Sequence, residues 1–321
     1  MPQSREQRRR SGVQAMSRSP HITALPSDSF VTTREIDLIC ERALAYLEIG
    51  QPVHLAGHAG TGKTTLALHL AALLGRPVML IHGDDAYSSA DLVGRDSGYR
   101  KSTLVDNYVH TVLKTEEEAR VYWAENRLTT ACRQGYTLIY DEFTRSRPEA
   151  NNALLAVLSE GLLPLPPVAG NDQGYLRVHP EFRAIFTSNP AEYTATHKTQ
   201  DALRDRLVTL QLTQLERDTQ VAIVSRRAGI SLESSERIVD LVIDLYRELA
   251  PEQPVSLRGA ITIGKLMSHR QEAVDGDSQW LRWACCDVLG ASLEGDLSPQ
   301  ELSHRVDAVV DRQLGTRSEE G

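Results

Sequence analysis

The sequence lacks several features that define broad classes of protein. Across its 321 residues, no apolar run approaches the roughly 18 residues of a membrane-spanning helix. The Arg- and Ser-rich stretch 1–20 has no apolar segment of the kind found in secretory signals. We therefore expect a cytoplasmic protein without a membrane partner.

Cysteine and positive charge are also scarce. The four cysteines, Cys40, Cys132, Cys285 and Cys286, show no paired spacing typical of a metal site, so we predict buried free thiols. The formal net charge of −8 and the isoelectric point near 5.7 argue against a protein that coats nucleic acid, and we expect no nucleic-acid partner. The 41% of hydrophobic residues suffices for a good core and for two domains.

What the sequence does contain is a glycine-rich turn between a predicted strand and a predicted helix. The stretch VHLAGHAGTGKTTLALHLAALL, residues 53–74, begins with strand-like alternation and ends in a dense apolar run. Its centre fits the G-x-x-x-x-G-K-[ST] pattern, in which backbone N–H groups and a helix N-terminus surround phosphate oxygens. An ordinary glycine-rich turn is the alternative, and the intact Gly-Lys-Thr triplet argues against it. The predicted nucleotide-binding residues are Gly57, His58, Ala59, Gly60, Thr61, Gly62, Lys63, Thr64 and Thr65.

Polar residues at predicted strand ends supply the other parts of a hydrolytic site. Lys63 would reach the β and γ phosphates, and the Thr64 hydroxyl would bind Mg²⁺. The acidic pair Asp141 and Glu142 follows an apolar strand, at the carboxyl edge where parallel sheets bind ligands. Asp141 would then hold Mg²⁺, and Glu142 would polarise the attacking water. Asn189 ends the next predicted strand, where its amide would orient that water, although asparagine there also begins ordinary turns.

Three arginines are candidates for stabilising charge on the transferred phosphoryl group. The stretch ALRDRL supplies Arg204 and Arg206, and SLRGA supplies Arg258 at the start of a predicted helix. An arginine that contacts the phosphoryl group in the transition state, called an arginine finger, raises the rate of phosphoryl transfer by ~10³–10⁵-fold. A surface salt bridge is the ordinary alternative for any one of them.

The order of the elements predicts the architecture. Strands alternate with helices as far as residue 212, and only helix patterns follow, which predicts an α/β fold with a parallel sheet and then a small all-helical lid. The stretch 88–135 is expected to be an interrupted helix. The expected divisions are a disordered basic tail or docking arm, an α/β nucleotide-binding domain, a helical lid domain and a second disordered tail, over residues 1–29, 30–212, 213–315 and 316–321.

Taken in chain order, these motifs resemble the AAA+ ATPases, specifically their MoxR-type branch. The resemblance implies a P-loop AAA+ sheet domain whose helix-2 insertion falls on residues 91–114 and whose hairpin insertion falls on residues 162–180. His58-Ala59 stands where the branch usually has Pro-Pro, and Leu257 stands where it has the proline of Ser-Pro-Arg. Arg204 remains a competitor for the finger. The matching residues are the Walker A loop 57–64, the Walker B pair Asp141 and Glu142, the sensor-1 Asn189, the arginine finger Arg206 and the sensor-2 Arg258.

Longer blocks are similar to a narrower group within this branch, the GvpN family of gas vesicle proteins. They include VDNYVHTVLKTEEE, YDEFTRSRPEANNALLAVLSEG and GYLRVHPEFRAIFTSNPAEY, and the similarity spans residues 32–212. The resemblance implies an ATPase that uses ATP and Mg²⁺ and is required for gas vesicle formation. It also implies self-association into a ring, expected to be hexameric, that remodels or chaperones gas vesicle proteins in the cytoplasm, in association with gas vesicles.

Other functions fit parts of the same pattern. A MoxR-type activator that inserts metal into another enzyme shares the ATPase motifs. A small-molecule P-loop kinase shares the phosphate loop but requires neither Glu142 nor Asn189, and a nucleotide-carrying shell component requires no turnover. A histidine metal site is not predicted, because a loop glycine separates His54 from His58 and no H-E-x-x-H motif occurs.

Overall fold

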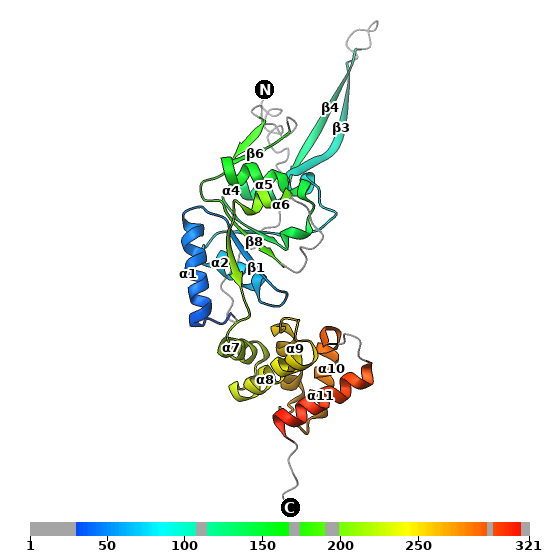
Figure 1. Cartoon of the computed structure of the whole chain (residues 1–321). Coiled ribbons are helices and arrows are strands. Elements are labelled where there is room, and N and C mark those ends of the chain that lie inside the picture. Colours follow the sequence, from blue (N-terminus) through cyan, green and yellow to red (C-terminus); the bar gives the residue numbers. More distant parts are fainter. Residues whose placement is uncertain (1–29, 107–113, 167–173, 190–198, 294–297, 316–321) are drawn as a thin grey trace, which may run out of the picture.

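The computed structural model describes residues 30–106, 114–166, 174–189, 199–293 and 298–315. Along the chain, an α/β region leads into an all-helical region. Figure 1 shows the helical region below the sheet and a long hairpin above it. The two predicted tails, 1–29 and 316–321, lie outside the described residues.

The α/β region is built on a five-stranded sheet with the order β2-β5-β8-β1-β9. Each neighbouring pair runs parallel, so the chain must cross over between strands, and helices make these crossovers. This confirms the predicted parallel α/β sheet. The strands are β1 (Val53–Gly57), β2 (Val78–His82), β5 (Thr137–Asp141), β8 (Arg183–Ser188) and β9 (Val208–Leu212). The helices of this region are α1 (Arg34–Glu48), α2 (Lys63–Leu73), α3 (Ser89–Val93), α4 (Arg127–Gln134), α5 (Pro148–Glu160) and α6 (Thr199–Arg204), with a 3₁₀ turn, η1 (Phe143–Arg145).

Alternate residues of the strands pack into two separate apolar cores. Leu55 and Ile139 belong to the core that contains residues of α1 and α2. Tyr140 and Phe186 belong to the core that contains residues of α3, α4 and α5. Because successive side chains of a strand point to opposite faces, this division shows that helices cover both faces of the sheet. Because both faces are covered, a ligand can reach the sheet at the ends of its strands, where polar residues lie.

The all-helical region has its own apolar core. Strand patterns stop at β9, and the five amphipathic stretches that follow bury residues such as Leu245, Ile263 and Val306, each 0% exposed. The helical content after residue 212 confirms that part of the predicted fold class, while the domain boundary itself stays a prediction. The helices are α7 (Arg217–Ala228), α8 (Leu232–Leu249), α9 (Leu257–Arg270), α10 (Gln279–Leu293) and α11 (Pro299–Leu314).

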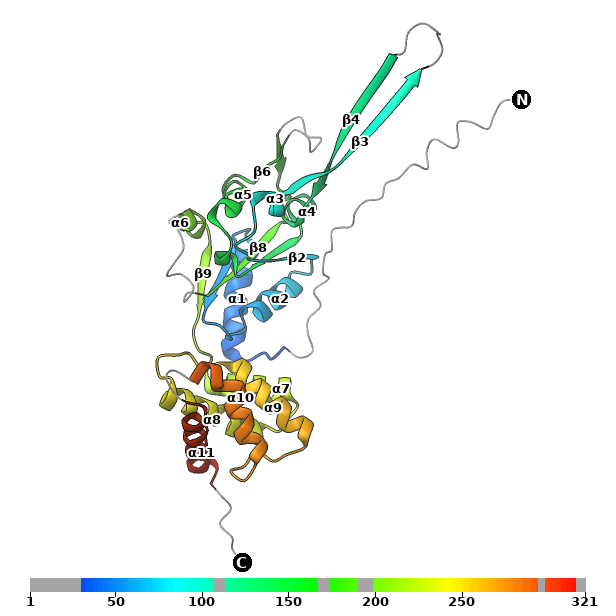
Figure 2. The same cartoon turned by 90° about the vertical axis from the view of Figure 1, so that its right-hand side faces the viewer.

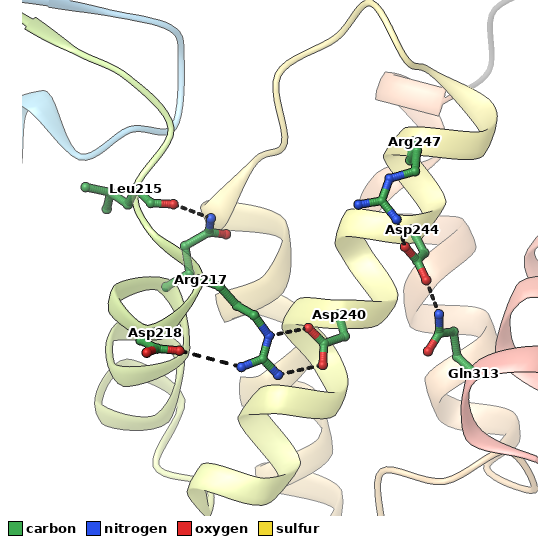
Figure 3. Close-up of polar contacts among 8 residues, drawn as sticks. Leu215, Arg217, Asp218, Asp240, Asp244, Arg247 and Gln313 are labelled. Carbon is green, nitrogen blue, oxygen red and sulfur yellow. Dashed lines mark hydrogen bonds and ion pairs between the residues drawn. The ribbon is translucent and has the colours of Figure 1, made fainter.

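Side-chain contacts fix the first helix after the sheet on both of its sides. Figure 3 shows Arg217 of α7 donating two hydrogen bonds to Asp240 of α8, at 2.6 and 2.7 Å. On the other side, the hydroxyls of Thr33 and Thr219 lie 2.9 Å apart, which ties α7 to the cap of α1. The connection between β9 and α7 is only the four residues 213–216.

The stretch that was expected to form an interrupted helix contains a long hairpin instead. Strands β3 (Gly94–Asp106) and β4 (Lys114–Glu125) pair antiparallel from Gly94 opposite Glu125 to Asp106 opposite Lys114. Figure 2 shows this hairpin projecting away from the sheet, on the side opposite the helical region. The helix prediction was wrong for residues 115–125 because pairing with β3 outweighs the helical propensity of the Glu-rich run. A helix, α4, begins only at Arg127.

A second, smaller hairpin precedes β8. Its strands are β6 (Leu162–Pro164) and β7 (Tyr175–Arg177), which pair antiparallel. The hairpin expected within residues 162–180 is confirmed, although residues 167–173 lie outside the described part of the chain.

Candidate functional site

The glycine-rich turn connects β1 to α2 at the accessible edge of the sheet. Gly60 and Gly62 both have φ of +83°, a conformation that favours glycine. A Cβ at Gly57 would lie 2.6 Å from the Leu212 carbonyl oxygen of β9, so only glycine fits between the two strands. Gly62 occupies the N-cap position of α2 and provides no side-chain cap, which leaves the first N–H groups of the helix available to a ligand.

Lys63 is held inside this turn. Its side chain is buried, and Nζ donates hydrogen bonds to the carbonyl oxygens of Gly57 at 2.8 Å and His58 at 2.7 Å. The His58 carbonyl also accepts a hydrogen bond from the Thr61 hydroxyl at 2.9 Å. Lys63 also lines the cleft beside this turn, where its ammonium group can meet phosphate oxygens.

Asp141 lies at the carboxyl end of β5, next to the start of α2. Its Oδ1 accepts hydrogen bonds from the hydroxyls of Thr64 at 2.8 Å and Thr187 at 2.6 Å. The Nδ1 of His82, at the end of β2, lies 3.4 Å from Asp141 Oδ2. A carboxylate and hydroxyl oxygens are the donors that Mg²⁺ prefers, so the residues present fit a magnesium ion. Thr187 was missed by sequence reasoning, although its place two residues before Asn189 was a usable signal.

Glu142 turns away from the strand in an unusual backbone conformation. Its φ is +51°, in the left-handed region that non-glycine residues seldom adopt, and such strain occurs at functional sites. Its backbone N–H donates to the Thr187 hydroxyl at 2.9 Å, and its carboxylate accepts a hydrogen bond from Arg145 Nη1 at 2.6 Å. Thr187 thus contacts both acidic residues. Arg145, which contacts Glu142, is a second residue that no sequence motif predicted.

These residues border a cleft of about 500 Å³ between the sheet edge and the helical region. The loop residues Ala59 to Thr65 line it, together with Asp141, Glu142 and Arg258. Its volume is in the range of small-molecule sites. Two more cationic residues of the helical region, Arg227 and Lys265, were missed because nothing in their local sequence marks them. The apolar part of the lining includes Phe30, Ile36, Ile39, Leu212, Leu257 and Ile261.

The other predicted site residues lie outside the lining of this cleft. Asn189 directly follows β8, between the ends of β5 and β1 in the sheet. Arg206 is exposed and donates hydrogen bonds to the Ser159 hydroxyl and the Ala202 carbonyl. Arg204 is partly buried, and this desolvation lowers the pKa of its guanidinium. The structure thus brings together the loop, the acidic pair and Arg258, and leaves both finger candidates apart from them.

Comparisons with known proteins agree with this geometry. The model of the family described as "AAA domain (dynein-related subfamily)" matches residues 52–207. The chain is 46% identical over 268 residues to "Gas vesicle ATPase GvpN" of Ancylobacter aquaticus, an alignment that covers 84% of this chain and 75% of the relative. The chain belongs to the GvpN family of gas vesicle ATPases. Its Haloferax mediterranei relative is 40% identical over 90% of this chain and 82% of its own length.

Membership in the GvpN family identifies the chain as an ATPase with a AAA+ fold. The kinase alternative is therefore set aside. Protein NorQ of Paracoccus denitrificans is more distant, at 28% identity over 59% of this chain and 63% of its own length. Among the described residues, no helix is long and apolar enough to cross a membrane. The roles of individual site residues stay predictions.

Proposed function

We propose that this ATPase supports the formation of gas vesicles by remodelling or chaperoning gas vesicle proteins. The observation that carries the proposal is the 46% identity to a GvpN over 84% of the chain, because the cleft alone would suit many ATPases. We place the protein in the cytoplasm, in association with gas vesicles. The weaker similarity to NorQ favours this function over that of a MoxR-type activator of another enzyme.

ATP would bind with its phosphates in the turn between β1 and α2. The N–H groups that begin α2 and the Lys63 ammonium would hold the phosphate oxygens, which is supported by their common place at the cleft. Thr64 and Asp141 would hold Mg²⁺, and their 2.8 Å contact supports this assignment. A bound Mg²⁺ would supply positive charge that offsets the charge of the phosphates. The apolar lining near Phe30 and Leu257 suits the base.

Glu142 would act as the general base toward water. Glu142 lines the cleft one residue beyond Asp141, which supports this assignment. Asn189 would orient the same water from the end of β8, and Arg258 would contact the phosphates from the helical lid over 213–315. Each group would lower the barrier only if it is held where charge develops.

Arg206 would complete the site of a neighbouring copy in a ring, which we propose to be hexameric. Its exposure, together with its absence from the lining of its own cleft, supports a role across an interface. Changes at one cleft would then reach the next copy through α6 and β9. Arg204 is the competing residue, since it lies only two positions away.

A deletion of the gene in its host tests the proposed role in vesicle formation. We expect vesicles to be absent, small or malformed while general growth continues. Wild-type protein should restore them, and Lys63→Ala protein at an equal level should not. Normal vesicles in a clean deletion would contradict the vesicle role, whereas full rescue by Lys63→Ala would contradict the need for ATP.

A further inference from the structure

His54 is a buried histidine near the start of β1, and both of its ring nitrogens lie within hydrogen-bond distance of a hydroxyl. Its side chain is 3% exposed. Nε2 lies 2.8 Å from the Ser188 hydroxyl of β8, and Nδ1 lies 3.0 Å from the Thr209 hydroxyl of β9. The ring also packs edge-on against Phe143, with centroids 5.3 Å apart. None of the proposed steps of hydrolysis uses this residue.

The histidine links three neighbouring strands. In the sheet order, β1 lies between β8 and β9, and His54 is opposite Phe186 on one side and Thr209 on the other. Its ring therefore reaches along β8 to Ser188 and directly across to Thr209 on the edge strand. A hydrogen bond on each side fixes the relative position of the three strands.

Each of these strands leads to or from a proposed functional group. Ser188 immediately precedes Asn189. His54 lies three residues before Gly57, where the phosphate loop begins. Thr209 lies three residues after Arg206, at the start of β9. The single side chain of His54 is thus connected to the loop, the water-orienting residue and the finger segment.

The surroundings of His54 favour a role in holding the three strands at fixed relative positions over a role in filling the core. Burial and the nearby charge of Arg204 lower the pKa of His54 to about 4, so the ring is neutral at neutral pH, with one donor and one acceptor nitrogen. A buried polar ring is costly unless its hydrogen bonds are made, while an apolar ring would pack among Phe143 and Phe186 without that requirement. A histidine with two hydroxyl partners therefore specifies geometry more than it adds stability.

We propose that His54 is a positioning residue for ATP hydrolysis. Through Ser188 and Thr209 it sets Asn189 and the segment 204–206 at fixed positions relative to the phosphate loop. The link serves turnover and leaves ATP binding unchanged, because the cleft lining contains none of its three residues. This inference rests on the proposed roles of Asn189 and Arg206.

The two hydroxyl partners allow a test in the full-length ATPase without removing the ring. We expect Thr209→Val and Ser188→Ala each to lower kcat by about tenfold, the scale of a small misplacement of a positioned group, with KM for ATP within about twofold of wild type. The double variant should lose less than the product of the single losses, because both arms act through one ring. Thr137→Val is the matched control, since the buried Thr137 hydroxyl of β5 has no hydrogen-bond partner among the described residues.

The same measurements separate this inference from the proposed function. Full turnover in both Asn189→Ala and Arg206→Ala would contradict the roles on which the link rests. If those variants lose turnover but Thr209→Val and Ser188→Ala keep the kcat of Thr137→Val, the link alone is overturned. A parallel loss of ATP affinity, or an equal loss of kcat in Thr137→Val, would also overturn it, because either result indicates a general structural effect.

Discussion

The carboxyl edge of the sheet carries connected, buried polar groups, whereas the interior of the helical region is mainly apolar and its ion pairs each include an exposed partner. At the sheet edge, Lys63, Asp141, Thr187 and Ser188 are all buried and hydrogen-bonded, and Ser188 is linked to the buried His54 near the start of β1. In the helical region, no charged side chain is buried among the described residues, and its ion pairs have at least one partner that is well exposed. Substitutions at the sheet edge should therefore change turnover, while those at the helical surface should change little.

The largest effect on turnover is expected at Arg206, an exposed side chain that we propose acts on a neighbouring copy. Arg206→Ala should leave ATP binding nearly intact and lower turnover by ~10³–10⁵, because the proposed finger would contact only the transition state. Mixing Arg206→Ala with Lys63→Ala subunits should restore part of the activity, since each supplies what the other lacks at a shared interface. ATP turnover of the mixed oligomers is the measurement.

Arg204→Ala is the matched control for the finger, because it removes the same charge from the same segment. No recovery of activity in verified mixed oligomers would argue for Arg204 or for a finger within one subunit. A fully active monomer would contradict the ring mechanism.

The acidic pair tests the sheet edge itself. Glu142→Gln should keep ATP binding and lower turnover by ~10²–10⁴, because it would remove the proposed general base and leave Asp141, the proposed Mg²⁺ ligand, in place. Lys63→Ala should instead remove tight ATP binding. Glu149→Gln, the same change at an exposed site on α5, should match wild type in both measurements. Wild-type turnover in Glu142→Gln would show that its assigned role is wrong.

The pH dependence of the free energy of unfolding tests the burial of the neutral His54 ring. The pKa of His54 is about 4 in the folded protein, below its value near 6.5 in an unfolded chain, so the unfolded state takes up the proton first. The stabilising effect of a neutral His54 is present above pH ~6.5 and is lost as the pH falls toward 4. Between pH 7.5 and 5 this loss amounts to about 2 kcal/mol in the free energy of unfolding.

Urea unfolding at the two pH values measures this effect. His54→Gln removes the titrating ring and should reduce the fall in stability between them by about the same amount. An unchanged fall in His54→Gln would assign the pH dependence to other groups.

The smallest effect is expected at the helical surface. Asp240→Asn weakens the ion pair with Arg217, whose side chains are 44% and 42% exposed, and exposed pairs contribute at most about 1 kcal/mol. Urea unfolding should therefore show a change below this value, with ATP turnover unaffected. A loss above roughly 2 kcal/mol would remove the distinction between the two regions.

The sequence predicted the fold and the phosphate loop because their signals are local. Gly57 to Thr64 form one continuous pattern, and the strand that ends in Asp141 is a single apolar run. Contacts such as Thr187 with Asp141, 46 residues apart, and His54 with Thr209, 155 residues apart, depend on strand order, which no local pattern specifies. The Glu-rich start of β4 misled the prediction because its local propensity differs from its tertiary pairing.

The four residues between β9 and α7 form the short connection about which the helical region would rotate relative to the sheet. The Arg217–Asp240 pair joins α7 to α8 just beyond this connection, and residues of the two helices share one apolar core. The hydrogen bond between the hydroxyls of Thr33, which caps α1, and Thr219 of α7 would resist such a rotation. A rotation of α7 would therefore strain this hydrogen bond and the one that the Glu216 backbone N–H donates to Glu35, or it would move the start of α1. Phe30, Ile36 and Ile39 along the wall of the cleft would then move too.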